Sequence, residues 1–166
     1  MGGTITTLDA VKYFLDYASW NPNAAILYRA SDMILRVDSD GAHLVAPKAR
    51  SRAGGYHFLG DSDGKMFNGP ICILAKVLKH VTASAAETEL GAIHSNAREG
   101  TIFRQTLEEL GHQQPATPIK TDNTTARGIL DDSMKARYLK GADMRLHWMK
   151  DRVESKTYDV YWEPSA

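Results

Sequence analysis

Apolar residues recur at spacings of three and four along residues 7–19, the period of an amphipathic helix. The positions that form this stripe are Leu8, Val11, Phe14, Leu15 and Ala18. Thr7 stands at the position of an N-cap, and Asn21-Pro22 ends the pattern. The sequence therefore predicts a helix over residues 7–19.

Three short apolar segments follow the predicted helix, and each has the length and composition of a β-strand. They are residues 33–40 (MILRVDSD), 54–60 (GGYHFLG) and 70–78 (PICILAKVL). The residues between the second and third segments, DSDGKMFNG, are turn formers, and the Asp40-Gly41 pair is typical of a turn that ends the first strand. Short connections of this kind favour an antiparallel meander.

The period then changes to that of a helix over residues 82–111, with Leu90, Ile93 and Ala97 on one face. Thr82 or Ser84, followed by Glu87, predicts a capped start, and Gly100 predicts a break. The remaining predicted elements are a strand at 119–121, helices at 123–130 and 132–154, and a strand at 158–164. The order β-β-β-α-β-α-α-β predicts an α/β (α+β) mixed sheet with helices packed against it, and no Gly-rich phosphate loop follows any strand.

The composition is that of one globular domain. The chain has 166 residues, 43% hydrophobic and 24% charged, which excludes a disordered class. No apolar run approaches the ~18 residues of a membrane span, and the first residues lack the pattern of a signal peptide. The single cysteine, Cys72, lies in an apolar segment, which favours a buried thiol and is compatible with a reducing compartment. Twenty basic and twenty acidic residues give a net charge of zero, which argues against tight non-specific binding of nucleic acid.

Three acidic residues lie near the ends of predicted elements. Asp40 ends the first strand, Glu89 lies near the start of the long helix, and Asp122 follows the fourth strand. If they converge, their repulsion requires cations, and hard oxygen ligands favour Mg²⁺ or Mn²⁺. Two such ions ~3.5–4 Å apart activate a water for phosphodiester hydrolysis. Each acid also has a simpler explanation, as a turn residue, a solvated helical residue and an N-cap respectively, and spacing leaves both interpretations open.

Five short motifs in order resemble the ribonuclease H domain of copia-type LTR retrotransposon polyproteins, together with the tail of the preceding reverse transcriptase connection segment. They are LDAVKYFLDYASWNPNAAILY, SDGAHLVAPKARSRAGGYHFLG, ASAAETELGAI, TPIKTDNTTA and KGADMRLHWMKDRV. The resemblance implies that residues 1–30 belong to the connection segment, as a helix packed on or preceding the domain. Residues 31–166 then form a ribonuclease H-like domain, a five-stranded mixed sheet with three antiparallel strands and flanking helices.

The family's metal ligands fall on Asp40, Glu89 and Asp122. Ser39-Asp40-Gly41 matches the family's Ser-Asp-Ala, which selects Asp40 over Asp38, and Glu89 is the second acid of the ETE motif. The resemblance implies two Mg²⁺ or Mn²⁺ ions, with Asp40 bridging both. It gives Asp143 only a structural role, paired with His147 at a spacing of four or bonded to a neighbouring loop.

The chain departs from the family pattern at two places. Ala42 and His43 replace the family's Asp and Trp, and the chain ends at YWEPSA, where the family continues into a helix carrying a fourth carboxylate. The domain is therefore expected to lack its last helix. Glu163 lies close in sequence to that segment, but no acid clearly replaces the fourth ligand.

The activity that the resemblance implies is hydrolysis of the RNA strand of RNA–DNA hybrids, with the reverse transcriptase part of the same polyprotein as a partner and an intracellular, cytoplasmic particle as the setting. Residues expected to contact the hybrid are Lys48, Arg50, Arg52 and Asn123. The alternative is a catalytically weak or silent domain with a structural or nucleic-acid-binding role. An integrase or transposase is disfavoured because its Glu follows the second Asp, whereas Glu89 precedes Asp122.

Overall fold

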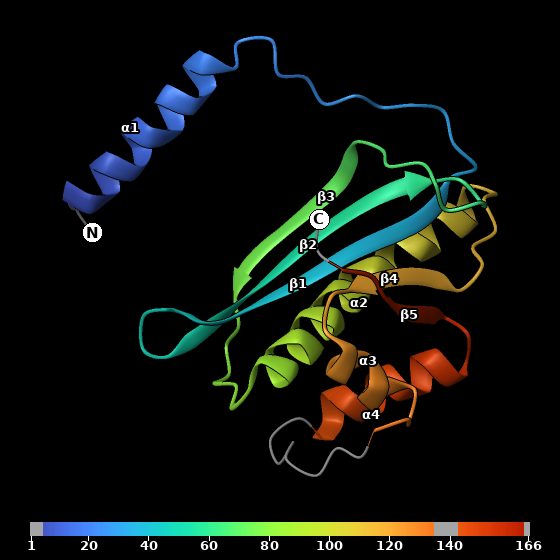
Figure 1. Ribbon diagram of the computed structural model, residues 1–166. Coiled ribbons are helices and arrows are strands. Elements are labelled where there is room, and N and C mark those ends of the chain that lie inside the picture. The colour runs from blue at the N-terminus through green and yellow to red at the C-terminus, as the bar shows by residue number, and fades with distance from the viewer. Residues whose placement is uncertain (1–4, 135–142, 165–166) are drawn as a thin grey trace.

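The computed structural model describes residues 5–134 and 143–164 (Figure 1). Its elements are α1 (Ile5–Trp20), β1 (Ile34–Ala46), β2 (Arg50–Gly60), β3 (Pro70–Val77), α2 (Ala85–Glu109), β4 (Thr117–Thr121), α3 (Thr124–Leu130), α4 (Asp143–Glu154) and β5 (Tyr158–Trp162). The predicted order of strands and helices is confirmed. Among the described residues, no helix combines the length and apolar composition needed to cross a bilayer.

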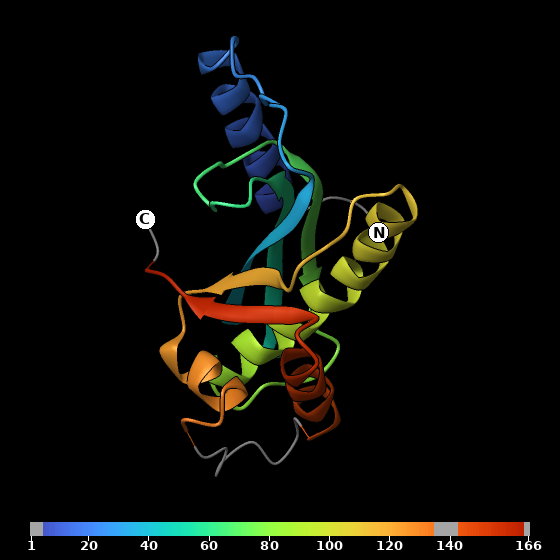
Figure 2. The ribbon, with the colours of Figure 1, turned by 90° about the vertical axis from the view of Figure 1, so that its right-hand side faces the viewer.

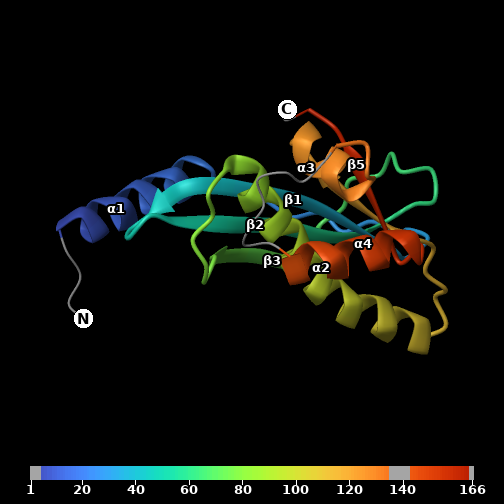
Figure 3. The same cartoon turned by 90° about the horizontal axis from the view of Figure 1, so that it is seen from below.

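The strands form one five-stranded sheet in the order β3-β2-β1-β4-β5. β1, β2 and β3 pair antiparallel, whereas β4 is parallel to both β1 and β5. The predicted mixed sheet with three antiparallel strands is therefore confirmed. α2 crosses one face of the sheet, with α4 beside it (Figures 1 and 3).

The two faces of the sheet differ in what lies against them. Ser39, Gly55 and Leu74 form one cross-strand row that faces α2, and we call this side the covered face. The next residues along, Asp40, Gly54 and Ala75, form a row on the opposite side, which we call the open face. The largest fully buried side chains of the hydrophobic core between sheet and helices include Leu35, Val37, Ile93, Ile119, Met149 and Tyr158.

The prediction that Asp40 ends the first strand is wrong. β1 continues to Ala46, and Gly41 stays paired with Ala53 of β2. The chain reverses only around Lys48, whose φ is 61°. Long-range pairing with β2 therefore overrides the local turn preference of Asp-Gly.

The predicted break at Gly100 is also wrong, because α2 is continuous from Ala85 to Glu109. A Cβ at Gly100 would lie 3.2 Å from the hydroxyl oxygen of Tyr158, and that hydroxyl donates a hydrogen bond to the Ala97 carbonyl at 2.6 Å. The glycine therefore makes room for a buried tyrosine of β5. The residues between 134 and 143, which fall within the predicted helix at 132–154, lie outside the described residues.

The predicted capped start of α2 is confirmed at Ser84. Its side chain accepts a hydrogen bond from the Glu87 amide at 3.1 Å, and the Glu87 carboxylate accepts one from the Ala83 amide at 2.8 Å. Together these bonds satisfy backbone donors that a helix N-terminus leaves without partners. The cap fixes where α2 begins. It therefore also fixes the position of Glu89, which lies five residues after Ser84 in the second turn of the helix.

α1 stands apart from the sheet, beyond the edge formed by β3 (Figures 1 and 2). Its large apolar side chains are exposed. The assignment of residues 1–30 to a preceding segment and 31–166 to the domain stays a prediction.

Candidate metal centre

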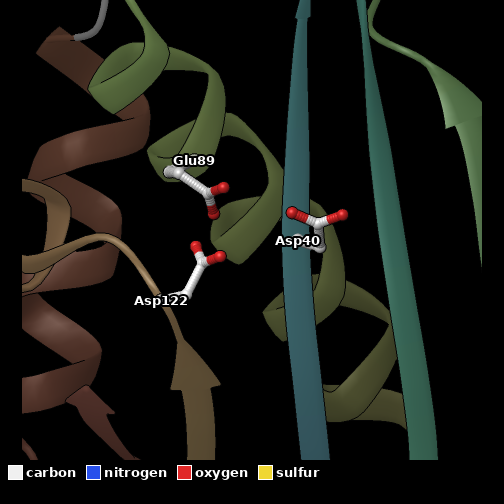
Figure 4. Close-up of side chains that lie close together, drawn as sticks. All are labelled: Asp40, Glu89 and Asp122. Atoms are coloured by element: carbon white, nitrogen blue, oxygen red, sulfur yellow. The ribbon is translucent and has the colours of Figure 1, made fainter. Parts of the chain in front are cut away.

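The structure brings the three predicted acidic residues together. Asp40 comes from β1, Glu89 from α2 and Asp122 from the residue after β4 (Figure 4). Each offers one carboxylate oxygen, and these oxygens all lie within 4.8 Å of one another. Glu89 is buried, whereas Asp40 and Asp122 are exposed. The three residues therefore form one compact acidic cluster that is open to solvent.

The strand pairing explains why Asp40 and Asp122 meet. β1 and β4 are parallel neighbours, and Asp38 is registered with Lys120. Two residues further along each strand are Asp40 and Asp122, on the same side as this registered pair because strand side chains alternate. The Asp122 carbonyl accepts a hydrogen bond from the Trp162 indole at 2.9 Å, which holds the end of β4 against β5.

Glu89 reaches the cluster because α2 approaches β1 closely at Gly41. The Glu89 carboxylate accepts a hydrogen bond from the Gly41 amide at 2.8 Å. A Cβ at Gly41 would lie 3.0 Å from the backbone nitrogen of Glu89 and 3.1 Å from its side-chain carboxyl carbon. These distances are shorter than most Cβ contacts in proteins. The absence of a side chain at residue 41 therefore lets the helix bring Glu89 next to Asp40.

The environment of Glu89 opposes its ionisation. Burial is the main cause that raises the pKa of Glu89 to about 7. The negative charges of Asp40 and Asp122 act in the same direction, and the hydrogen bonds from Gly41 and the Thr121 hydroxyl act against it. A divalent cation between the three carboxylates would remove this repulsion, and oxygen-only donors suit Mg²⁺ or Mn²⁺. The residues present therefore fit a hard divalent metal.

A cavity of about 520 Å³ opens beside the acidic cluster on the open face. Its lining includes Asp40 and Asp122, together with Asp38, Lys120 and Glu163. The Lys120 ammonium lies 3.3 Å from the Asp38 carboxylate and 3.9 Å from the Glu163 carboxylate. Asp38 is thus paired with a lysine, and it is not a member of the acidic cluster.

Of the basic residues expected to contact the hybrid, Arg52 shares a hollow with the acidic cluster. It is exposed and lines a hollow of about 180 Å³ together with Asp40 and Ala42. Lys48 lies at the exposed tip of the β1–β2 hairpin, and the guanidinium of Arg50 donates a hydrogen bond to the Lys79 carbonyl.

Asn123 caps the helix that follows the cluster. Its side chain accepts a hydrogen bond from the Ala126 amide at 2.9 Å. The cap of α3 is thus Asn123, and the alternative role of Asp122 as that cap is wrong. Nothing is described of the side chain of Asp143, so its predicted pairing with His147 lies outside the described residues.

The sequence reasoning missed two features of the site. Lys120 carries no local signal of a role, because only the β1–β4 pairing places it opposite Asp38. The Nδ1 atom of His43 lies 2.8 Å from the Thr88 hydroxyl, and the buried Thr82 and Ser51 hydroxyls continue this network. The network joins the β1–β2 hairpin to the first turns of α2, next to Glu89.

Solved structures identify the fold as that of ribonuclease H. LC11-RNase H1, isolated from compost by a metagenomic approach, aligns with a TM-score of 0.57 at 10% identity, over 80% of this chain and 85% of that one. The same enzyme in complex with an RNA/DNA hybrid aligns with a TM-score of 0.58 at 9% identity, over 78% and 85%. The N-terminal RNase H domain of Rv2228c from Mycobacterium tuberculosis, solved as a fusion with maltose-binding protein, gives a TM-score of 0.51 at 11% identity, over 80% and 83%.

In sequence, the chain is similar to a retrotransposon polyprotein. It is 26% identical over 152 residues to the Retrovirus-related Pol polyprotein from transposon TNT 1-94 of Nicotiana tabacum. The alignment covers 92% of this chain and 11% of that polyprotein. No known family profile matches the chain. The predicted resemblance to a ribonuclease H domain of a retrotransposon polyprotein is confirmed.

Proposed function

We propose that the chain is a ribonuclease H that hydrolyses the RNA strand of RNA–DNA hybrids in the presence of a divalent metal. The observation that carries the proposal is the convergence of Asp40, Glu89 and Asp122 within 4.8 Å on a ribonuclease H fold. The hybrid bound by LC11-RNase H1 and the similarity to a Pol polyprotein support the substrate class.

Asp40, Glu89 and Asp122 would hold the metal, which when bound acts as a Lewis acid and activates a water for attack on phosphorus. Gly41 and Thr121 orient the Glu89 carboxylate through hydrogen bonds to its two oxygens, at 2.8 and 3.4 Å. The open cavity beside Asp40 and Asp122 leaves room for a phosphodiester to approach. We expect the site to bind two ions of Mg²⁺ or Mn²⁺.

Contacts to the hybrid are assigned to the basic residues of the β1–β2 hairpin. Arg52 lines the same hollow as Asp40, and the exposed Lys48 places a second positive charge at the tip of the hairpin. Discrimination of RNA from DNA would come from 2′-hydroxyl contacts in the wide minor groove of a near-A-form duplex. The proposed partner in the cell is the reverse transcriptase part of a polyprotein, in an intracellular particle.

The test is cleavage of an end-labelled RNA–DNA hybrid by the 166-residue chain in Mg²⁺ and separately in Mn²⁺. We expect cleavage of the RNA strand only, leaving 3′-hydroxyl and 5′-phosphate ends. The Asp122→Asn variant should remove it while leaving the circular dichroism spectrum unchanged, because Asp122 is exposed. Cleavage that persists in this variant would exclude the proposed metal centre.

A weakly active or silent domain is the second candidate. Its motivation is that the acidic cluster found among the described residues has three members, whereas the family pattern has four. A metal held by fewer ligands is bound less tightly, so this candidate predicts low activity that is higher in Mn²⁺ than in Mg²⁺. Equal or higher rates in Mg²⁺ would argue against it, and a folded chain without activity in either metal would favour a binding role.

A further inference from the structure

α1 carries an apolar stripe that lies in solvent. At 100° per residue, Leu8, Val11, Leu15 and Ala18 lie along one side of the helix. The opposite side carries Asp9 and Asp16 together with the exposed aromatic residues Tyr13, Tyr17 and Trp20. Leu8, Val11 and Leu15 are about half exposed, at 54%, 48% and 57%. A continuous stripe of aliphatic side chains on a helix is usually buried against another surface.

The open face of the sheet carries a matching apolar strip along β3, formed by Ile71, Ile73 and Val77, which we call the β3 strip. These side chains alternate with residues of the covered face, so they point away from α2. Their exposed fractions are 41%, 63% and 45%. Ala75 lies between them and is also exposed. No described helix lies over this strip (Figures 1 and 2).

The segment after α1 is fastened to the start of β3. The Leu27 carbonyl accepts a hydrogen bond from the Gly69 amide at 3.0 Å, and the Tyr28 hydroxyl donates one to the Pro70 carbonyl at 3.0 Å. A Cβ at Gly69 would lie 2.7 Å from the Tyr28 ring, so the glycine lets this segment lie directly on the loop before β3. Leu27 follows Trp20 by seven residues, a reach of at most about 25 Å. The helix is therefore tethered within reach of the β3 strip.

The direction and length of α1 also fit β3. α1 and β3 run in opposite directions, and α1 lies on the side of β3 away from α2 (Figures 1 and 2). The 16 residues of α1 span about 24 Å, and the eight residues of β3 span about 27 Å. The helix can therefore cover the strip along its whole length without reversing its direction.

We propose that α1 folds back onto the sheet of its own chain and covers the β3 strip with its apolar stripe. The occupant is the helix of the same chain because a short tether gives it a high effective concentration at the strip. Ile73 belongs to the strip and also lines the cavity beside the acidic cluster, so the docked helix forms one wall of that cavity. The proposal does not depend on the nuclease activity.

A disulfide between α1 and β3 tests the proposal in the full-length chain. With Trp20 placed beside Pro70, Val11 falls close to Ala75, so Val11→Cys is combined with Ala75→Cys in a chain where Cys72→Ser removes the native thiol. The matched control replaces Val11→Cys with Asp9→Cys, which lies on the side of α1 opposite Val11. After mild oxidation, intramolecular and intermolecular disulfides are separated on a non-reducing gel and confirmed by mass spectrometry.

We expect the Val11 pair to form an intramolecular disulfide at least about tenfold faster than the Asp9 pair, because docking fixes which side of the helix faces the strip. Equal rates would overturn the proposal, because they indicate a helix that moves freely on its tether. Disulfide-linked dimers whose rate rises with protein concentration would overturn it too, in favour of exchange of α1 between two copies.

Small-angle scattering of chains without engineered cysteines gives an independent measurement. The Val11→Asp substitution should release the helix and increase the radius of gyration, whereas Asp9→Asn should leave it unchanged. A radius that is the same for the native chain and for Val11→Asp contradicts docking, even if both variants fold fully.

Discussion

The covered and open faces of the sheet are built from alternating residues of the same strands, yet they are packed very differently. On the covered face, Gly55 faces Asn96 of α2, a fully buried residue whose amide donates hydrogen bonds to Ser39 and to the Gly54 carbonyl at 3.0 and 2.8 Å. On the open face, Gly54 has only Asp40 atoms nearby, at 3.7 Å or more from where its Cβ would be. The covered face therefore fixes the position of α2, and the open face leaves space for substrate.

Glu89 connects the two faces. Glu89 belongs to α2, the helix on the covered face, but its carboxylate lies beside the carboxylates of Asp40 and Asp122 (Figure 4). The chemistry of the open face is thus positioned by packing on the other side, through the close approach of α2 at Gly41. Substitutions on the open face should change activity with little effect on stability, and substitutions on the covered face should change stability first.

The largest expected effect is loss of activity on the open face. We expect Asp40→Asn to reduce hybrid cleavage at least about 100-fold, because even outer-shell partners of a metal are worth about 10- to 100-fold. The free energy of unfolding without metal should stay the same or rise, because the substitution removes a negative charge next to Glu89 and Asp122. Single-turnover cleavage and urea denaturation measure the two quantities.

Asp38→Asn is the matched control, two residues away on the same strand and lining the same cavity. Its carboxylate is paired with Lys120 and lies outside the acidic cluster, so cleavage should fall by less than about tenfold, the effect of a partly exposed ion pair. Equal losses in both variants would mean that the cavity's negative charge as a whole, and not the cluster, supports activity.

The sequence pattern alone predicted the element order but left the acidic cluster undecided. Asp40 and Asp122 are 82 residues apart, and they meet because β1 and β4 are parallel neighbours, a pairing that hydrophobic periodicity does not encode. The motif resemblance supplied that missing long-range information and selected Asp40, Glu89 and Asp122. The role of Lys120 depends on the same pairing, and no family motif marked it.

The two errors in the fold have a common physical cause. Asp40-Gly41 and Gly100 are local signals for a turn and for a helix break, but each glycine is required by a neighbour from elsewhere in the chain. Gly41 admits Glu89, and Gly100 admits the Tyr158 ring. Local propensity is a weak guide where tertiary packing selects a residue for its small size.

The next largest effect is expected for Gly55→Ala on the covered face. The added Cβ would come within 2.6 Å of the Asn96 amide carbon, so the buried amide must move and lose hydrogen bonds. We expect a destabilisation of about 2–4 kcal/mol, from overpacking and loss of buried hydrogen bonds. Gly54→Ala, one residue along the strand, should change stability by less than about 0.5 kcal/mol. Urea denaturation of both variants checks this, and similar losses would contradict the distinction between the faces.

The pH dependence of stability should report on Glu89. Its pKa is about 7 in the folded protein and near 4.5 when unfolded, so between these values the folded state retains a proton that the unfolded state has lost. Without metal, stability relative to Glu89→Gln should therefore fall as pH rises from about 4.5 to about 7, by up to about 3 kcal/mol, and stay level above pH 7.

Comparison with Glu89→Gln is necessary because burial lowers the pKa of His57 and His94, which makes stability rise with pH over part of the same range. These histidines contribute equally to both proteins, so the difference isolates Glu89. A saturating divalent metal should remove the difference in slope near neutral pH, because it favours ionised Glu89. Parallel stability curves for the two metal-free proteins would contradict the raised pKa.

The smallest expected effect concerns Arg52, on the open face beside Asp40. If its guanidinium contacts a phosphate, Arg52→Ala should reduce the slope of log affinity for the hybrid against log salt by about 1, while cleavage at saturation changes little. Arg127→Ala is the matched control, because it also removes one positive charge but lies on α3, in an ion pair with Asp131 at 3.3 Å. Fluorescence anisotropy at several salt concentrations measures both slopes. An equal change in the two variants would assign the effect to net charge, and only a change specific to Arg52 places the duplex along the open face.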